Sequence, residues 1–202
     1  MKKKDIKNYF NAIVSGNINI VASLIDTDKE YLTVCNVAPP KKDDGQSGLQ
    51  AALLSGNFSV AKLLIERGAD VNFMDASDVN AWQMPVLNDS IRAAIFCSYT
   101  LQKNTRVFDE AFEVMQLMLS KGANANGIDS YGNNALLRGI LDARQMINNT
   151  RATLEDGILL SQLRRIFKAL LDAGAAPGSK NNKRDSANHF ITAFSLQQYN
   201  LW

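Results

Sequence analysis

Few side chains in this 202-residue sequence are of the types that do chemistry, and they do not cluster. His189 is the only histidine, and Cys35 and Cys97 are the only cysteines. A lone histidine cannot build a metal site, and two distant cysteines form neither a zinc finger nor a disulfide framework. We expect both cysteines to be small buried hydrophobic residues. The sequence therefore predicts no metal and no cofactor.

Carboxylates are the other candidates for chemistry, because paired acids can act as general acid and general base. Those on the predicted polar helix faces and in the turns are expected to be solvated or to cap helices. They are Glu66, Asp70, Glu110, Glu113, Asp156 and Asp172. The sequence has no nucleophile elbow, no phosphate-binding loop and no dinucleotide-binding glycine motif. We expect no catalytic activity, and an enzyme with an unfamiliar site is the least favoured function.

The elements that position these side chains are easiest to recognise between Asp44 and Asn72. Two apolar stripes have helical spacing there, and they consist of Leu49, Ala52 and Leu53 and of Val60, Leu63 and Leu64. Ser47 can cap the first helix and Asn57 the second. Gly68 follows the second helix, where a left-handed residue without Cβ is favoured. The stretch predicts a helix, a turn, a second helix and a loop.

This unit resembles the ankyrin repeat, which has a period of about 33 residues. The residues that match in register are Gly45, Ser47, Leu49, Ala52, Gly56, Val60, Leu63, Leu64, Gly68, Ala69, Asp70, Val71 and Asn72. The departures are Gly48 and Gln50, where the family usually has Pro and His. The resemblance implies an all-α solenoid of stacked helix-turn-helix units with short hairpin fingers. It also implies that His189 braces neighbouring loops.

Three glycines mark the ends of successive units. Gly68, Gly122 and Gly174 are 54 and 52 residues apart, which is roughly 20 more than the family period. Asp5 is expected to cap the first helix of the chain. We predict one domain over residues 1–202, with repeats at about 5–38, 43–74, 75–128 and 129–178 and a C-terminal cap at 179–202.

The extra residues are expected to lengthen both helices of the third and fourth repeats. Apolar stripes continue to about Tyr99 and Ile147, and a further helix is predicted over 154–173 after a loose capping box of Thr153 and Asp156. Two such extensions can be buried together if they form an antiparallel slab of four long helices. The alternative is a pair of disordered insertions, which the periodicity disfavours.

Two predicted fingers carry apolar residues that the core does not need. If Pro85 takes the family's Pro position, the finger before it is four residues longer than usual. We predict a partner-binding surface on it and on the next finger, made of Phe73, Met74, Val79, Trp82, Ile128, Tyr131 and Asn133. Partner sites favour aromatic and Met anchors. In the alternative, Trp82 takes the repeat's Leu position in the core.

The function that the resemblance implies is recognition of a protein partner by the fingers and the concave helix face. A net charge of +2 does not indicate a polyanion, so we expect no nucleic-acid partner. Several loop residues could line up along one edge of the solenoid, namely Lys41, Lys42, Lys180, Lys183 and Arg184. The acids expected on the same edge would oppose phosphate, and they are Asp43, Asp44, Asp75, Asp78 and Asp129. Recruitment of an acidic partner by the Lys run at the N-terminus is an alternative interpretation of those lysines.

Self-association is the second candidate function, through the long helices or the apolar tail from Tyr199 to Trp202. We therefore expect a monomer or a weak homodimer. The sequence has no apolar run long enough to cross a bilayer and no signal-peptide pattern. These features predict a cytoplasmic protein without a membrane partner.

Overall fold

Helices make up nearly all the regular structure of the residues that the computed structural model describes, which are 1–39, 41–99 and 103–202. The α-helices are α1 (Lys3–Val14), α2 (Ile18–Thr27), α3 (Gly48–Leu54), α4 (Phe58–Glu66), α5 (Val86–Phe96), α7 (Thr105–Ser120), α8 (Ala135–Ile147), α9 (Ile158–Asp172) and α10 (Ala187–Ala193). The 3₁₀ turns are η1 (Lys29–Leu32) and η2 (Gln197–Tyr199). Isolated antiparallel bridges join Cys35 to Ser47 and Met74 to Pro85.

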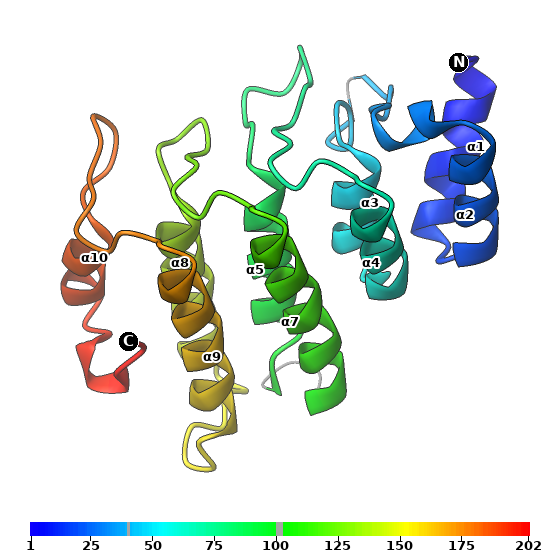
Figure 1. Cartoon of the computed structure of the whole chain (residues 1–202). Helices are drawn as coiled ribbons and strands as arrows, with labels where there is room; N and C mark the ends of the chain where they lie inside the picture. Colours follow the sequence, from blue (N-terminus) through cyan, green and yellow to red (C-terminus); the bar gives the residue numbers. More distant parts are fainter. Residues whose placement is uncertain (40, 100–102) are drawn as a thin grey trace.

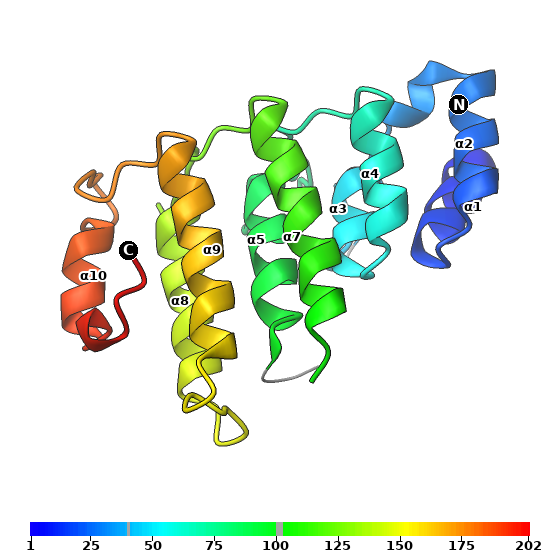
Figure 2. The same cartoon turned by 60° about the horizontal axis from the view of Figure 1, so that its bottom comes forward.

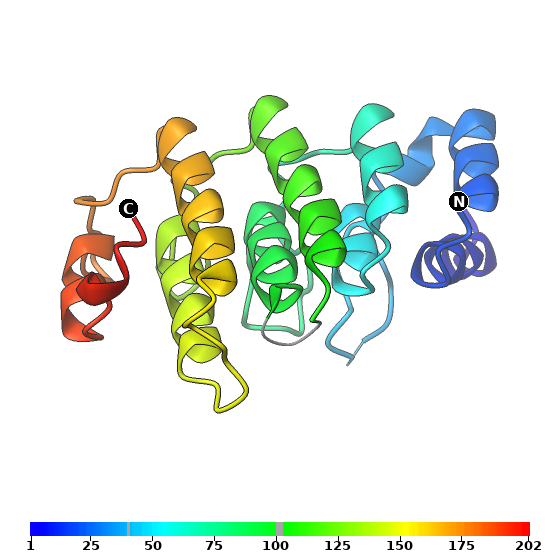
Figure 3. The same cartoon turned by 90° about the horizontal axis from the view of Figure 1, so that it is seen from below.

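The helices form pairs that stand side by side in one row (Figure 1). One layer contains α1, α3, α5, α8 and α10, each in contact with the next, and a second layer contains α2, α4, α7 and α9. Figure 3 separates the two layers. The hairpin loops project from one side of the row (Figure 1). The predicted all-α solenoid of stacked helix pairs is therefore confirmed.

Local chemistry sets where α3 begins and where α4 ends. Ser47 Oγ accepts a hydrogen bond from the backbone N–H of Gln50 at 3.2 Å, and Gln50 Oε1 accepts one from the backbone N–H of Ser47 at 3.0 Å. This reciprocal pair is a capping box. Beyond α4, Gly68 has a φ of +96°, a left-handed conformation that costs glycine little. Both predicted signals are confirmed.

Two predicted caps are wrong. The side chain of Asn57 does not cap α4; its Nδ2 donates to the carbonyls of Ile13 and Val14 at 2.8 and 2.9 Å. Those carbonyls lie at the end of α1, where no following turn of helix supplies N–H groups to them. The side-chain amide of Asn57 therefore binds the preceding repeat instead of capping its own helix. Asp5 lies inside the first turn of α1, because its own N–H already donates to the carbonyl of Lys2 at 2.9 Å.

The lengthened helices predicted for the third and fourth repeats are present. α5, α7, α8 and α9 have 11, 16, 13 and 15 residues, whereas α3 and α4 have 7 and 9. α5 contacts α7, α8 and α9, and α9 contacts α7 and α8. The long helices extend beyond the shorter pairs on the side opposite the fingers (Figure 1), and Figure 2 shows the same extension from another angle. Their shared core includes Ile91, Phe108, Met115, Ile140, Leu163 and Phe167, all fully buried. Residues 100–102, beyond the stripe that reaches Tyr99, lie outside the described residues.

The start of α9 differs from the prediction. The helix begins at Ile158 rather than at 154, because Gly157 has a φ of +71° and a left-handed residue cannot belong to an α-helix. Asp156 Oδ1 accepts from the backbone N–H of Ile158 at 3.0 Å, so this carboxylate orders the turn before the helix. The predicted capping box with Thr153 is therefore wrong.

Side chains join successive repeats, both in the turns that follow the second-layer helices and along the second layer itself. Asn72 accepts from the N–H of Asn124 at 2.8 Å and donates to the carbonyl of Gly122 at 3.1 Å. Asn126 makes the equivalent pair of bonds to the following loop at 3.0 and 2.9 Å. Ion pairs join successive helices of the second layer, and they are Arg67–Asp26, Lys62–Glu113 and Arg165–Asp109. These bonds join the repeats side by side along the row.

The tail folds back onto its own chain. Leu201 is buried, and the Trp202 ring centroid lies 5.0 Å from that of Phe167. Arg164 donates to the carbonyls of Tyr199 and Asn200 at 2.7 and 2.9 Å. Leu201 and part of the Trp202 ring are therefore used inside the chain, while Trp202 stays 39% exposed. Among the described helices, none is both long enough and apolar enough to span a membrane.

Candidate partner-binding surface

The finger that carries Trp82 is longer than its neighbours. Pro85 is the N-cap of α5 and lies 17 residues after Gly68, whereas Asn134, the N-cap of α8, lies 12 residues after Gly122. Pro85 therefore takes the capping position and not the family's Pro position, which is one residue later. The extension is five residues rather than the predicted four.

Hydrogen bonds hold this long finger against the preceding loop. Ser77 Oγ donates to Asp44 Oδ2 at 2.7 Å and accepts from the N–H groups of Val79 and Asn80 at 3.2 and 3.1 Å. The N–H of Ala76 donates to the carbonyl of Gly45 at 3.0 Å. The backbones approach so closely there that a Cβ on Gly45 would lie 2.1 Å from the Ser77 nitrogen. The extra residues are therefore fixed in place.

The other side of the finger is fastened to the loop that carries Tyr131. The N–H of Gln83 donates to Ser130 Oγ at 3.1 Å, and the N–H of Ser130 donates to the carbonyl of Gln83 at 2.9 Å. These bonds place the ring centroids of Trp82 and Tyr131 6.4 Å apart. Two aromatic side chains from successive fingers thus form one surface.

The structure exposes five of the seven residues predicted for partner binding. Trp82 is 41% exposed and Tyr131 is 54% exposed, and the other three are Met74, Val79 and Ile128. Trp82 is therefore not a core residue, and the alternative that placed it there is wrong. Phe73 packs against the core and is partly buried. Asn133 is buried, and its Nδ2 donates to Asp129 Oδ2 at 2.9 Å, so it closes its own finger and is removed from the surface.

A cavity of about 530 Å³ lies beneath Trp82, between its finger and the helices α3 and α5. The Arg92 guanidinium faces the Trp82 ring, 5.6 Å from its centroid, which is within the range of a cation–π contact. Arg92 Nε also lies 3.6 Å from Asp142 Oδ2, and Asp142 forms a two-pronged ion pair with Arg138 at 2.6 and 3.0 Å. Trp82 therefore rests on a charged network anchored in α8.

Asp44, Asp75 and Asp89 also border the cavity; sequence reasoning placed Asp44 and Asp75 among the acids of the finger edge and missed Asp89. Gln50 Nε2 donates to Asp75 Oδ1 at 2.7 Å and to Asp89 Oδ2 at 3.1 Å, so one amide joins a finger to the buried face of α5. Burial raises the pKa of Asp89 to about 7, although the bond from Gln50 opposes the shift. Burial also raises the pKa of Asp75, against the bonds from Met84 and Gln50. The departure at Gln50 was the one signal of this link in the sequence.

The other chemical candidates lie apart from this surface. The role of bracing a neighbouring loop, which the resemblance implied for His189, is filled by Gln50 through its bond to Asp75. The His189 side chain is 57% exposed, and its Nδ1 lies 3.9 Å from Asp185 Oδ2. Cys35 and Cys97 are partly rather than fully buried, and burial raises the pKa of both thiols. The part of the chain that the structure describes contains no group of three metal-binding side chains. The arrangement is suited to contact with another molecule.

Two comparisons relate the chain to known proteins. Residues 44–76, the stretch with the matching register, fit the ankyrin repeat family. Ankyrin repeat and SAM domain-containing protein 6 of Danio rerio is 35% identical to this chain over 74 residues. That match covers 37% of this chain and 9% of the relative, so the chain corresponds to a small part of that protein's length.

Proposed function

This chain is an ankyrin-repeat protein, and we propose that it binds a protein partner through the surface formed by Met74, Val79, Trp82, Ile128 and Tyr131. Ankyrin repeats are in general protein-interaction modules, which supports the class of function. The observation that carries the proposal is the exposed pair of Trp82 and Tyr131 on two fingers that are joined by hydrogen bonds. We call this set of five residues the finger surface.

The composition and the rigidity of the finger surface both favour binding. Trp, Tyr and Arg dominate the energetically important positions of protein interfaces, and Trp82, Tyr131 and Arg92 lie together here. A partner that docks on a surface already held in shape loses less conformational entropy than one that must order a loop. The long finger meets this condition because Ser77 and Gln83 fix it on both sides.

The test is affinity capture from the source cell followed by mass spectrometry, with wild type and two double variants as bait. Trp82→Ala/Tyr131→Ala removes the aromatic pair. Ile18→Ala/Ile20→Ala is the matched control, because it removes two exposed apolar side chains of α2, away from the fingers. We expect partners that wild type and the control retain and that the finger variant loses. Equal retention by all three baits would reject the finger surface.

Stability measurements keep this test interpretable. Truncation of a fully buried aromatic residue costs about 3–5 kcal/mol, whereas surface substitutions usually stay within about 0.5 kcal/mol of wild type. Because Trp82 is 41% exposed and Tyr131 is 54% exposed, we expect the finger variant to lose about 1–2 kcal/mol in urea unfolding. The variant therefore stays folded, and lost capture reports on the surface.

Self-association through the tail has less support than partner binding. The tail residues Leu201 and Trp202 pack on their own chain, and Trp202 lies against Phe167 of α9. Light scattering tests this alternative, because a tail-mediated dimer requires a mass that rises with concentration and that falls on Trp202→Ala substitution.

A further inference from the structure

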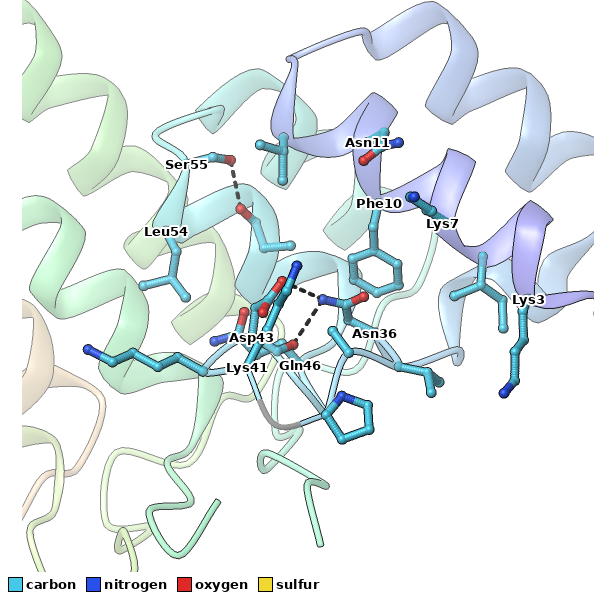
Figure 4. Close-up of a pocket in the computed structure, with 17 residues that line it drawn as sticks. Lys3, Lys7, Phe10, Asn11, Asn36, Lys41, Asp43, Gln46, Leu54 and Ser55 are labelled. Carbon is cyan, nitrogen blue, oxygen red and sulfur yellow. Dashed lines mark hydrogen bonds between the residues drawn. The ribbon is translucent and has the colours of Figure 1, made fainter. Parts of the chain in front are cut away.

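A second groove lies next to the cavity under Trp82, between α1, α3 and the loop residues 33–39 and 41–46. Its volume is about 780 Å³ (Figure 4). Lys42, Gln46 and Leu54 line both this groove and the cavity under Trp82, so the two are neighbours. The finger surface does not include this groove. We call it the lysine groove, after the residues described next.

Positive charge surrounds the lysine groove. Four lysines line it, Lys3 and Lys7 from α1 and Lys41 and Lys42 from the loop. All four are exposed, and within residues 1–39, 41–99 and 103–202 none of them forms an ion pair. The one acid in the lining is Asp43, whose Oδ2 accepts from Asn36 Nδ2 at 2.8 Å (Figure 4). Four cations without an internal counter-ion therefore face the same space.

The groove also exposes apolar side chains that the core does not use. Val14, Val37 and Leu54 are 57%, 58% and 51% exposed, and all three line it. The ring of Phe10 lies on the floor between α1 and the loop (Figure 4). Large apolar residues gathered in a concave place mark interaction sites more often than single exposed ones do. The groove thus combines an apolar floor with a basic rim.

Backbone bonds hold the wall of the groove in shape. The N–H of Asn36 donates to the carbonyl of Gln46 at 2.8 Å, and the N–H of Gly45 donates back to the carbonyl of Asn36 at 2.8 Å. The N–H of Ala38 donates to Asp44 Oδ1 at 2.8 Å. These bonds therefore join the two sides of the loop that carries Lys41 and Lys42.

We propose that the lysine groove binds an acidic amphipathic segment of a protein. Carboxylates of the segment pair with the lysines, while its apolar side chains cover Val14, Val37 and Leu54. This complementarity of charge and apolar area identifies the occupant. The inference goes beyond the finger surface and holds or fails without it, because the two sets of residues do not overlap.

A protein segment fits the groove better than a nucleic acid does. Single-stranded nucleic acids bind where aromatic side chains offer faces for stacking. Phe10, the aromatic side chain of this lining, is 6% exposed, so a base has no face to stack on. An apolar floor suits leucine or phenylalanine side chains.

The experiment measures fluorescence anisotropy of a labelled synthetic peptide in which pairs of glutamates alternate with pairs of leucines. Lys41→Glu/Lys42→Glu reverses two charges of the groove. Lys121→Glu/Lys180→Glu is the control, because it makes the same change in net charge at two exposed positions, one at the end of α7 and one in the loop between α9 and α10. We expect the groove variant to weaken binding by about tenfold or more and the control by about twofold or less.

Further arms separate the contributions and the sources of binding. A peptide with Gln in place of Glu should bind about tenfold more weakly, and Leu54→Ser should weaken the acidic peptide although all lysines remain. The finger variant Trp82→Ala/Tyr131→Ala should bind this peptide like wild type, which keeps the two proposals apart. Equal losses for both lysine pairs, no binding of the acidic peptide, or tighter binding of a single-stranded oligonucleotide would overturn the lysine groove.

Discussion

Replacing Asp89 by Asn should stabilise the protein, and the gain should grow with pH. Asp89 is 2% exposed on α5, and burial raises its pKa to about 7. The amide has nearly the same shape as the carboxyl group and carries no charge at any pH. Its Oδ1 can accept the hydrogen bond that Gln50 Nε2 now donates to Asp89 Oδ2 at 3.1 Å. The substitution therefore removes the cost of the charge and keeps the contact.

The sign and the size follow from proton linkage. An unfolded aspartate titrates near pH 4, so between about pH 4 and pH 7 the folded state holds a proton that the unfolded state has lost. The stability that Asp89 contributes is complete below pH 4 and is lost as pH rises to about 7. Each pH unit is worth about 1.4 kcal/mol, so the advantage of Asp89→Asn should grow by about 3 kcal/mol between pH 5 and pH 8.

The assay is urea unfolding of wild type and Asp89→Asn at pH 5, 6, 7 and 8, followed by the fluorescence of Trp82 and Trp202. The comparison uses the difference between the two proteins, because other groups titrate equally in both. Asp75→Asn is a useful companion, since Asp75 is more accessible and should give a smaller slope in the same direction. A difference that stays constant with pH, or that shrinks as pH rises, would refute the assignment of a raised pKa to Asp89.

Two further predictions concern the loops that align the fingers. Gly132 and Gly174 share a φ of +85°, but a Cβ on Gly132 would lie 2.7 Å from Lys183 Cβ, whereas a Cβ on Gly174 would meet nothing within 4 Å. Gly174→Ala should lower the free energy of unfolding by about 1 kcal/mol, and Gly132→Ala should lower it by at least about 1 kcal/mol more, as measured by urea unfolding. Equal losses for the two variants would disprove the steric argument. Asn126→Ala removes both bonds to the next loop and should cost about 1–2 kcal/mol; an unchanged urea midpoint would mean that water replaces them at no loss.

The sequence predicted best those features that depend on a few neighbouring residues. Ser47 caps α3 as predicted, through the N–H of Gln50 three residues on, and Gly68 takes the left-handed conformation predicted for it. The lengthening of the helices was also predictable, because burial along a helix repeats with a fixed period. These signals are local, so the stack of helix pairs follows from them.

The errors occurred where one side chain had two possible partners. Asn57 stands at the N-cap of α4, but the free carbonyls at the end of α1 compete for its amide. Pro85 occupies the N-cap of α5 rather than the position after it. The sequence could not reveal this shift of one residue, because the length of the finger before Pro85 was not known. Asn133 was assigned to the partner surface, although Asp129 requires its amide to close the finger. In each case the tertiary structure decides between two locally acceptable arrangements.

The candidate sites depend even more on contacts between distant residues. The aromatic residues of the fingers were predictable, because a protruding loop has no use for Trp82 and Tyr131 in its own folding. The environment of Asp89 was not predictable, because α3, α5 and the finger above them bury it together. Gln50, which donates a hydrogen bond to Asp89, lies 39 residues before it in the sequence. Gln50 occupies the position where the family usually has a loop-bracing histidine, and here its amide reaches two acids at once. A neutral Asp89 can remain beside Asp75 without repulsion, so the raised pKa and the bridging amide together explain how two acids are accommodated beneath an exposed tryptophan.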